Sequence, residues 1–352
     1  MKNAALTVLV LFMTLFSAQP APAGERIPLI LASSGEEGDN FAHVTFQKFM
    51  GLIEEKAPGA FDIQYRPGLV MGDEAETVRL TQSGSIQMAT LLSNTMATFA
   101  PSVGWMNMPY FFEDRESFHR AALALWDKTN RRVIRESGCR IVLINEIGFR
   151  NLTTGAGHRV SNLEEARKLK IRLPVSAQGV ALYDALGLNP VIINFAETFN
   201  ALAEGRVDGQ ETAYSLVTLK KFYEVQKYAL DIEAGLHVGF VIADEKWLRS
   251  LPPHLRQAVL EAGKEASVYE FKVVAPEYLA RDRAIMEKAG MEFLGRPTDF
   301  EAWRELGRQS WPQIYKIIGR GDETEGRALV ALAEMAVKGQ LPSEPHKRQE
   351  RL

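Results

Sequence analysis

Two arginines stand where a guanidinium could hold a carboxylate. Residues 170–174 (KIRLP) alternate as a strand does, so Ile171 and Leu173 point to one face and Arg172 to the other. Arg150 likewise follows directly after an apolar segment. Open α/β sheets bind ligands at the carboxyl ends of their strands, and a guanidinium can hold a carboxylate through two parallel hydrogen bonds. Each arginine is therefore a candidate ligand contact, although on residue type alone a surface or structural charge is the commoner interpretation.

No catalytic or cofactor motif accompanies these arginines. The six histidines have no H-E-x-x-H or other metal-ligand spacing, and the sequence has neither a glycine-rich nucleotide loop nor a G-x-S-x-G elbow. Paired carboxylates such as Glu54 and Glu55 are typical of solvated surface. We therefore expect no catalytic residue, no metal ion and no cofactor.

The composition is that of a folded protein without a strong charge bias. The 352 residues are 46% hydrophobic and 24% charged, and the formal net charge of -3 gives no reason to expect a nucleic-acid partner. The single cysteine, Cys139, begins an apolar segment and cannot form an internal disulfide. We expect it to be a small buried side chain and not a nucleophile.

The N-terminus has the three parts of a secretory signal peptide. Lys2 supplies a positive charge, residues 4–16 are nearly continuously apolar, and small residues follow at 21–23. A membrane anchor is the alternative, but the apolar run is shorter than the roughly 20 residues that a spanning helix needs. We expect residues 1–23 to be removed after Ala23 and the mature chain to be periplasmic.

The order of the elements predicts two α/β lobes. Segments typical of strands alternate with segments of helical periodicity, which favours βαβ units and a mostly parallel sheet. The expected strands are 28–32, 61–65, 86–89, 140–148, 170–173, 191–195 and 238–243. The expected helices are 41–49, 73–82, 178–185 and 196–203.

A long helix is expected over residues 253–288, with a kink at Pro276 as the one proline in its interior. At 1.5 Å per residue it would reach about 50 Å, enough to cross two domains. We expect a two-lobed clamshell whose ligand lies in the cleft, with crossing segments at 144–149 and 236–241. The expected parts are lobe I at 24–148 with 237–265, lobe II at 149–236 with 289–340, and a loose tail at 341–352.

Several segments, taken in order, resemble one known family. Residues 162–174 (NLEEARKLKIRLP) are similar to its "DLKGLKIRVP" segment, and residues 205–211 (GRVDGQE) match its "G-x-VDGQE" signature. Residues 71–88, 108–112 and 148–154 are similar to its "LG-x-E…GxxxM", "LPFLF" and "GFRxLT" segments. The sequence thus resembles the solute-binding proteins of tripartite ATP-independent periplasmic (TRAP) transporters over nearly all of its length after the signal peptide.

The resemblance implies a receptor for a small organic carboxylate, in which Arg172 pairs with the ligand and Arg150 assists. Glu74 lies near the pocket in relatives, where it could accept hydrogen bonds from ligand hydroxyl groups or cap its own helix. Thr212 replaces an asparagine that often touches the carboxylate in relatives. Because threonine offers one hydroxyl and no amide, the third partner of the carboxylate is expected to be Tyr214 or Asn151.

Other implied features concern the rest of the pocket. Phe195 and Tyr214 are expected to shape it, with core packing as the alternative for Phe195. A subset of the family holds its ligand through a metal ion, for which Glu211 and Gln178 could supply oxygen atoms, but we expect none here.

The implied partners are the small and large TRAP membrane subunits, which would drive uptake with an ion gradient, and the receptor itself is expected to be a monomer. Two rival functions stay open. One is a periplasmic enzyme on the same fold, such as a carboxylate dehydratase with Glu74 or Glu146 as its acid or base. The other is a sensory receptor for a carboxylate.

Overall fold

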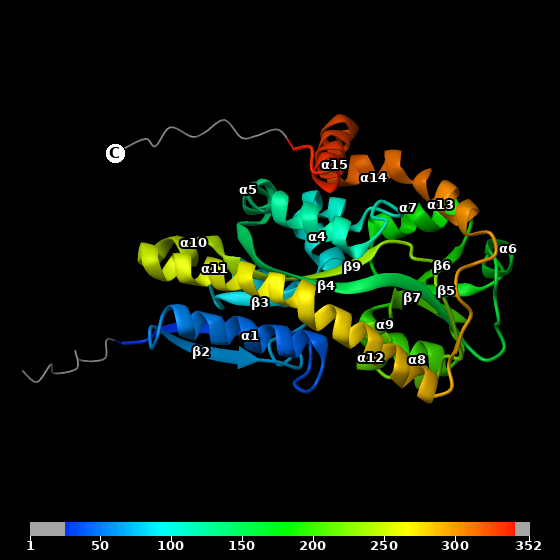
Figure 1. Ribbon diagram of the computed structural model, residues 1–352, viewed down its shortest axis with the longest axis horizontal. Helices are drawn as coiled ribbons and strands as arrows, with labels where there is room; N and C mark the ends of the chain where they lie inside the picture. The colour runs from blue at the N-terminus through cyan, green and yellow to red at the C-terminus, as the bar shows by residue number, and fades with distance from the viewer. Residues whose placement is uncertain (1–24, 342–352) are drawn as a thin grey trace, which may run out of the picture.

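The computed structural model describes residues 25–341, which form a sheet crossed by a long helix and covered by further helices (Figure 1). The strands follow the order β2-β1-β3-β9-β4-β7-β5-β6, and β8 and β10 extend from β4. The strands are β1 Ile27–Ala32, β2 Phe61–Arg66, β3 Met88–Leu92, β4 Cys139–Thr154, β5 Lys170–Leu173, β6 Asn189–Ile192, β7 Gly209–Ala213, β8 Tyr228–Leu230, β9 Leu236–Asp244 and β10 Glu292–Phe293.

Two lobes share this sheet. The first lobe is built on β1, β2 and β3, and the second on β5, β6 and β7. The helices of the first lobe are α1 Phe41–Lys56, α2 Glu74–Gln82, α3 Ser93–Phe99, the 3₁₀ helix η1 Pro101–Asn107, α4 Arg115–Ala124, α5 Trp126–Ser137 and α10 Glu245–Ser250. The second-lobe helices are α6 Leu163–Ala166, α7 Ala177–Leu186, the 3₁₀ helix η2 Phe195–Glu197, α8 Thr198–Ala203, α9 Tyr214–Leu219 and the 3₁₀ helix η3 Phe222–Glu224.

The sheet is mixed, which corrects the expected mostly parallel arrangement. Strands β1, β2 and β3 are parallel to one another, as are β5, β6 and β7. By contrast, β9 runs antiparallel to β3 and β4, and β4 runs antiparallel to β7 and β8. The reason is topological, because β4 carries the chain from the first lobe to the second and β9 carries it back.

Strand β4 changes partner where the lobes meet. It pairs with β9 as far as Phe149 and with β7 from Arg150 onward. The β4–β9 register shifts between Glu146 and Gly148, and Gly148 has φ 113°, a conformation that favours glycine. The crossing segments expected at 144–149 and 236–241 lie in these two strands.

The long helix is continuous over the expected range, but its irregularity differs from the predicted proline kink. It comprises α11 (Pro253–Tyr269), a π-helical turn (Glu270–Val274) and α12 (Ala275–Lys288). Pro276 lies in the first turn of α12, just after the π turn, which supplies the altered hydrogen bonding that a proline requires. Figure 1 shows the helix running from α1 to α9, and α11 packs on α1 and β4 while α12 packs on α9 and β4.

Each lobe has a hydrophobic core on both faces of its strands. In the first lobe one core contains Trp105 and Phe118, and the other contains Phe49 and Val259. In the second lobe Ile171, Leu173, Tyr183 and Trp303 form one core, and Val217, Phe222 and Ala229 belong to the other. Because both faces are covered, polar side chains on these strands are buried unless they reach the cleft.

The C-terminal helices connect the lobes on one side. Helix α13 (Phe300–Arg308) packs on α7, α14 (Trp311–Ile318) packs on α7 and η1, and α15 (Glu323–Val337) packs on α4 and η1. The lobe boundaries stay a prediction, and α15 packs against elements that the prediction assigns to lobe I. The predicted signal peptide, 1–23, and residues 342–352 of the predicted tail lie outside the described residues. Within 25–341 no helix combines the length and the apolar character needed to cross a membrane.

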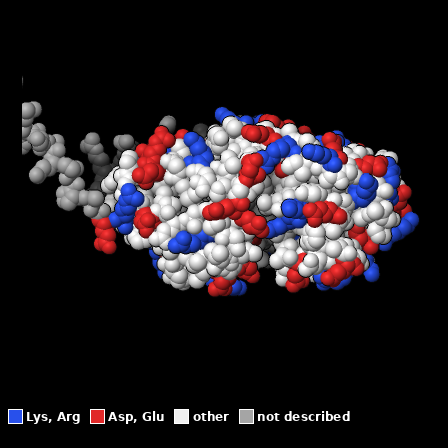
Figure 2. All heavy atoms as spheres, turned by 90° about the horizontal axis from the view of Figure 1, so that it is seen from below, with Lys and Arg blue, Asp and Glu red and all other residues white. Residues whose placement is uncertain are grey.

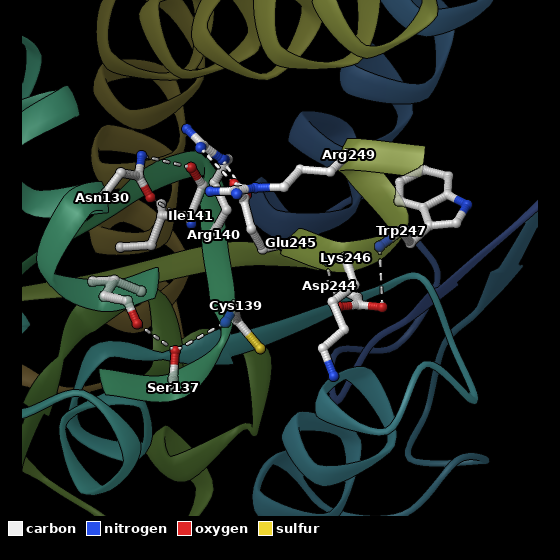
Figure 3. A network of polar contacts seen from close by, with 11 residues as sticks. Asn130, Ser137, Cys139, Arg140, Ile141, Asp244, Glu245, Lys246, Trp247 and Arg249 are labelled. Carbon is white, nitrogen blue, oxygen red and sulfur yellow. Dashed lines mark hydrogen bonds and ion pairs between the residues drawn. The ribbon is translucent and has the colours of Figure 1, made fainter. Parts of the chain in front are cut away.

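The far end of β4 holds a polar network that is drawn in Figure 3. Cys139 is fully buried, as predicted, and burial raises the pKa of its thiol to about 12. Beside it Arg140 donates to both carboxylate oxygens of Glu245, at 2.6 and 2.9 Å. This ion pair connects β4 to α10, about ten residues along β4 from Arg150.

Candidate functional site

A cavity lies where the ends of the second-lobe strands face the first lobe. It encloses about 440 Å³ of empty space, part of which is open to solvent. The first lobe contributes Asn94, Asn107 and Pro109. The remaining lining residues are Arg150, Leu173, Ser176, Gln178, Gly179, Leu182, Glu211, Ala234 and Gly235. Carboxamide, hydroxyl and charged groups therefore dominate the polar part of its wall.

Arg150 and Glu211 form a buried ion pair in this wall. The Arg150 Nε and Nη2 atoms donate to the two Glu211 carboxylate oxygens at 2.5 and 2.7 Å, and Nη2 also donates to the Glu211 carbonyl oxygen. Burial alone would lower the pKa of Arg150, but the charge and hydrogen bonds of Glu211 outweigh it and leave that pKa raised. Glu211, considered from sequence only as an oxygen donor to a metal ion, is thus the counter-ion of Arg150.

Arg172 is a buried cation that forms no ion pair with any described residue. Its side chain is 2% exposed, its Nε donates to the Ile193 carbonyl oxygen at 3.0 Å, and its Nη2 has no partner among the described residues. Its guanidinium carbon lies 5.8 Å from the centre of the Phe195 ring. Burial, followed by the positive charge of Arg150, lowers the pKa of Arg172 to about 10. An anion bound here would relieve both effects.

His237 is a site residue that the sequence analysis missed. It lies on β9 opposite Gly148, is 4% exposed, and neither ring nitrogen has a partner in the part of the chain that the structure describes. Burial and then the charges of Arg150 and Arg172 hold its pKa well below the usual range, so the ring is neutral at pH 7. Its sequence signal is weak, namely one polar residue inside the otherwise apolar segment 236–243.

Gln178 connects the two lobes at the cavity. It lies on α7, whose N-cap Ser176 and C-cap Gly187 fix the helix position. The Gln178 amide donates to the carbonyl oxygen of Gly104 in η1 at 3.0 Å, a buried contact. A Cβ at position 104 would lie 2.5 Å from Ile318 Cγ2 and 2.7 Å from the Gln178 amide nitrogen, so one of these side chains would have to shift.

Glu74 is engaged within the first lobe. Its carboxylate accepts hydrogen bonds from the Ser34 hydroxyl, the Leu92 backbone N–H and the Thr95 hydroxyl at 3.2, 3.2 and 2.5 Å. Burial raises the pKa of this carboxyl group despite these bonds. The N-cap of α2 is Asp73, so Glu74 does not cap its own helix.

Four further predicted contacts lie outside the cavity wall. The Asn151 side-chain oxygen accepts from the Glu233 backbone N–H at 3.0 Å, and Thr212 is buried opposite Asn151 in the β4–β7 pair. The Tyr214 hydroxyl donates to Asp231 at 2.5 Å.

Phe195 packs edge-on against Phe222 at 5.9 Å. It also lies against both the second-lobe core and the small cluster between the lobes that contains Phe41 and Leu216. Of the predicted ligand contacts, Arg150 is the one that lines the described cavity.

The cavity wall holds one arginine, one carboxylate and several carboxamides. Arg172 and His237 do not line the cavity, but both are near enough to Arg150 for its charge to lower their pKa values. Two neighbouring arginines are suited to holding an anion. Residues 25–341 contain no group of three or more His, Cys, Asp or Glu side chains placed to hold a metal ion. On the face seen in Figure 2, lysine and arginine are interspersed with aspartate and glutamate, so no large basic patch competes with the site there.

Known proteins share this architecture. The chain is 25% identical over 282 residues to the 2,3-diketo-L-gulonate-binding periplasmic protein of Escherichia coli K12, covering 79% of this chain and 84% of that protein. A TRAP periplasmic solute-binding protein of Rhodobacter sphaeroides, solved in an open apo form, superposes with a TM-score of 0.77 at 31% identity, over 88% of this chain and 99% of that one.

A second solved structure, a TRAP periplasmic solute-binding protein of Roseobacter denitrificans with bound L-galactonate, has a TM-score of 0.76 at 23% identity, over 87% of this chain and 99% of that one. Residues 33–317 match the family described as bacterial extracellular solute-binding protein, family 7. The chain therefore belongs to family 7 of the bacterial extracellular solute-binding proteins, the family of the periplasmic binding components of TRAP transporters.

Proposed function

We propose that this protein is the periplasmic receptor of a TRAP transporter and binds a small organic carboxylate, with Arg172 as the anchor and Arg150 assisting. The observation that carries the proposal is the buried Arg172 guanidinium, which has no counter-ion among the described residues. An unpaired buried charge is costly, and a carboxylate ligand would supply both its opposite charge and two parallel hydrogen bonds.

The cavity wall supports a hydroxylated acid over an alkyl or aromatic one. Asn94, Asn107, Ser176 and Gln178 present side-chain donors and acceptors, and no aromatic side chain lines the cavity. Asn107 is paired with Ser93, Gln178 donates to Gly104, and Ser176 caps α7, whereas the Asn94 side-chain oxygen has no partner among the described residues. Hydroxyl groups of a ligand could bond Asn94 and the remaining hydrogen-bonding capacity of the other three, which an apolar acid could not.

Contributions from both lobes support a closure mechanism. The cavity is lined from η1 and α3 on one side and from α7, β4 and β7 on the other. A ligand that bridges these groups would favour the closed arrangement, and the loss of water on closure would strengthen its ion pair with Arg172. The closed, monomeric receptor would then dock on the two membrane subunits.

The test is a thermal-shift screen of the chain from Gly24 onward, after unfolding and refolding to remove any bound ligand. The panel contains sugar acids, C4-dicarboxylates, keto acids, aromatic acids and alkyl acids, and it includes L-galactonate, D-erythronate and D-glucuronate because solved relatives hold them. An acid at one hundred times its Kd adds about 2.7 kcal/mol, which raises the melting temperature by several degrees.

We expect a shift with hydroxylated acids that disappears in Arg172→Met and persists in Arg140→Met, which removes a half-buried arginine outside the cleft. A screen with no shift for any acid would count against the proposed function. Mass spectrometry of the bound acid before and after incubation separates a receptor, which returns it unchanged, from an enzyme.

A further inference from the structure

Three buried polar side chains form a row across the second lobe. Thr153 on β4 is paired with Gln210 on β7, and Gln210 is paired with Arg172 on β5. Residues directly opposite one another in a sheet point to the same face, with Cβ atoms about 5 Å apart. Thr153 and Gln210 are 0% exposed and Arg172 is 2% exposed, so bulk water does not reach the row.

Each side chain of the row has at least one polar atom without a hydrogen-bond partner among the described residues. No partner among the described residues is found for the Thr153 hydroxyl, for either polar atom of the Gln210 amide, or for Nη2 of Arg172. The missing partners match along the row, because a guanidinium N–H can donate to the Gln210 oxygen, and the Gln210 nitrogen can donate to the Thr153 oxygen. Buried polar groups are nearly always paired, directly or through an internal water.

The ends of the row are apolar. Ala229 on β8 is paired with Thr153, and Val191 on β6 is paired with Arg172. The core packed on this face contains Ile193, Val217 and Phe222. The side chains at the two ends of the row therefore offer it no polar partner, which leaves its members one another or a shared water as the nearest partners along the row.

We infer that Thr153, Gln210 and Arg172 form a hydrogen-bonded relay completed by one internal water, in which Gln210 is a positioning residue for Arg172. This inference rests on the proposed function of Arg172 as the carboxylate anchor. The Ile193 carbonyl oxygen holds Nε of Arg172, and Gln210 would hold one Nη2 hydrogen. The end-on edge of the guanidinium then stays free for the ligand.

The relay makes a prediction that packing alone does not. Gln210→Glu has nearly the same shape but sets a carboxylate beside the unpaired Arg172 charge. The new ion pair stabilises the ligand-free protein and competes with the ligand, so stability and affinity change in opposite directions. Gln210→Leu removes the acceptor and leaves the guanidinium free to reorient.

The variants are Gln210→Glu, Gln210→Leu and Thr153→Val. The control is Gln226→Glu, because Gln226 is also buried and has an unpaired side-chain oxygen but is not part of the row. Two measurements need no ligand: the urea midpoint, and the Arg172 Nε–H resonance in arginine-labelled protein, assigned by its loss in Arg172→Lys. Calorimetry then gives the Kd for whichever panel acid shifts the wild-type melting temperature most.

We expect Gln210→Glu to raise the urea midpoint and to weaken binding by about 100-fold, the scale of one charge-assisted hydrogen bond. Gln210→Leu should move the Arg172 resonance and weaken binding by about tenfold, and Thr153→Val should move the resonance less. Gln226→Glu should lower the midpoint and leave the Kd within about twofold.

An unmoved Arg172 resonance in Gln210→Leu would overturn the relay, as would wild-type affinity in Gln210→Glu. If no panel acid binds the wild type, the proposed function fails, while the resonance and the urea midpoint still decide the relay.

Discussion

Replacing Arg172 by methionine should weaken ligand binding and stabilise the ligand-free protein at the same time. Methionine is unbranched and fills a similar volume without a charge. The ligand loses its charged partner, while the apo protein loses a buried guanidinium that has no counter-ion among the described residues. A variant that gains stability but loses affinity indicates a residue that serves binding at the expense of stability.

The size of the stability change follows from the lowered pKa. Burial and Arg150 lower the pKa of Arg172 to about 10 from an ordinary 12.5, and one pKa unit corresponds to about 1.4 kcal/mol, which gives a cost of roughly 3 kcal/mol. At pH 7 the group is protonated in both the folded and the unfolded states, so the whole cost is present. Loss of the bond to Ile193 and of the contact with Phe195 offsets about half of it. The net gain should be about 1–2 kcal/mol.

The loss of affinity should be larger than this gain. Two charge-assisted hydrogen bonds contribute about 1.5–3 kcal/mol each, so a Kd higher by 100-fold or more, about 3 kcal/mol, is expected. Arg172→Lys should recover part of it, because an ammonium keeps the charge without the planar pair of donors.

Urea unfolding of the ligand-free protein and calorimetry with the acid found in the screen measure the two effects. Arg140→Met is the control, and it should lose stability without losing affinity because the Arg140–Glu245 pair lies outside the cleft. If Arg172→Met loses both stability and affinity, Arg172 is a structural residue and the reasoning is refuted.

Three further predictions concern neighbouring features. Glu211→Gln should destabilise the apo protein by about 3 kcal/mol, since it leaves the buried Arg150 without its counter-ion. A bound acid would then supply the missing negative charge, so the rise in melting temperature on adding the acid should be larger than in the wild type. An equal rise in differential scanning fluorimetry would contradict this. Burial and then the charge of Glu146 raise the pKa of Glu270 well above its usual range. As pH rises above about 4.5, Glu270 therefore loses its proton in the unfolded protein while it keeps it in the folded protein. The free energy of unfolding should fall over this range by at most about 1.4 kcal/mol per pH unit. Glu270→Gln should therefore stabilise the protein at pH 7, with a difference that vanishes near pH 4 in urea titrations. Gly263→Ala should cost about 3 kcal/mol, because its Cβ would lie 1.9 Å from the Val142 carbonyl oxygen, and a wild-type urea midpoint would refute the close approach of α11 to β4.

Local patterns predicted much of the second lobe. The alternation in residues 170–174 placed Ile171 and Leu173 on one face of the strand and Arg172 on the other. Ile171 and Leu173 lie in the core with Tyr183, and Arg172 lies on the other face against Phe195. Helix α7 was expected at 178–185 and occupies Ala177–Leu186, ending at Gly187 in the left-handed conformation. Such features depend on neighbouring residues, whose spacing is visible in a sequence.

Other features depend on strand register and on the path between lobes. The Arg150–Glu211 pair joins residues 61 positions apart, and the antiparallel register of β4 with β7 brings them together. The antiparallel crossing of β4 and β9 and the π turn ahead of Pro276 were likewise absent from the prediction, because each reflects how two lobes share one sheet and one helix.

The sequence was enough to predict the family and the alternating elements, and with the family resemblance it made Arg172 and Arg150 the candidate partners of a carboxylate. The tertiary structure alone decided which charges are paired. It gives Arg150 a counter-ion and withholds one from Arg172 among the described residues, buries His237 beside them, and aligns Gln210 with Arg172. The physical reason is that burial and pairing are set by contacts between segments distant in the chain, and the cost of a charge depends on those contacts.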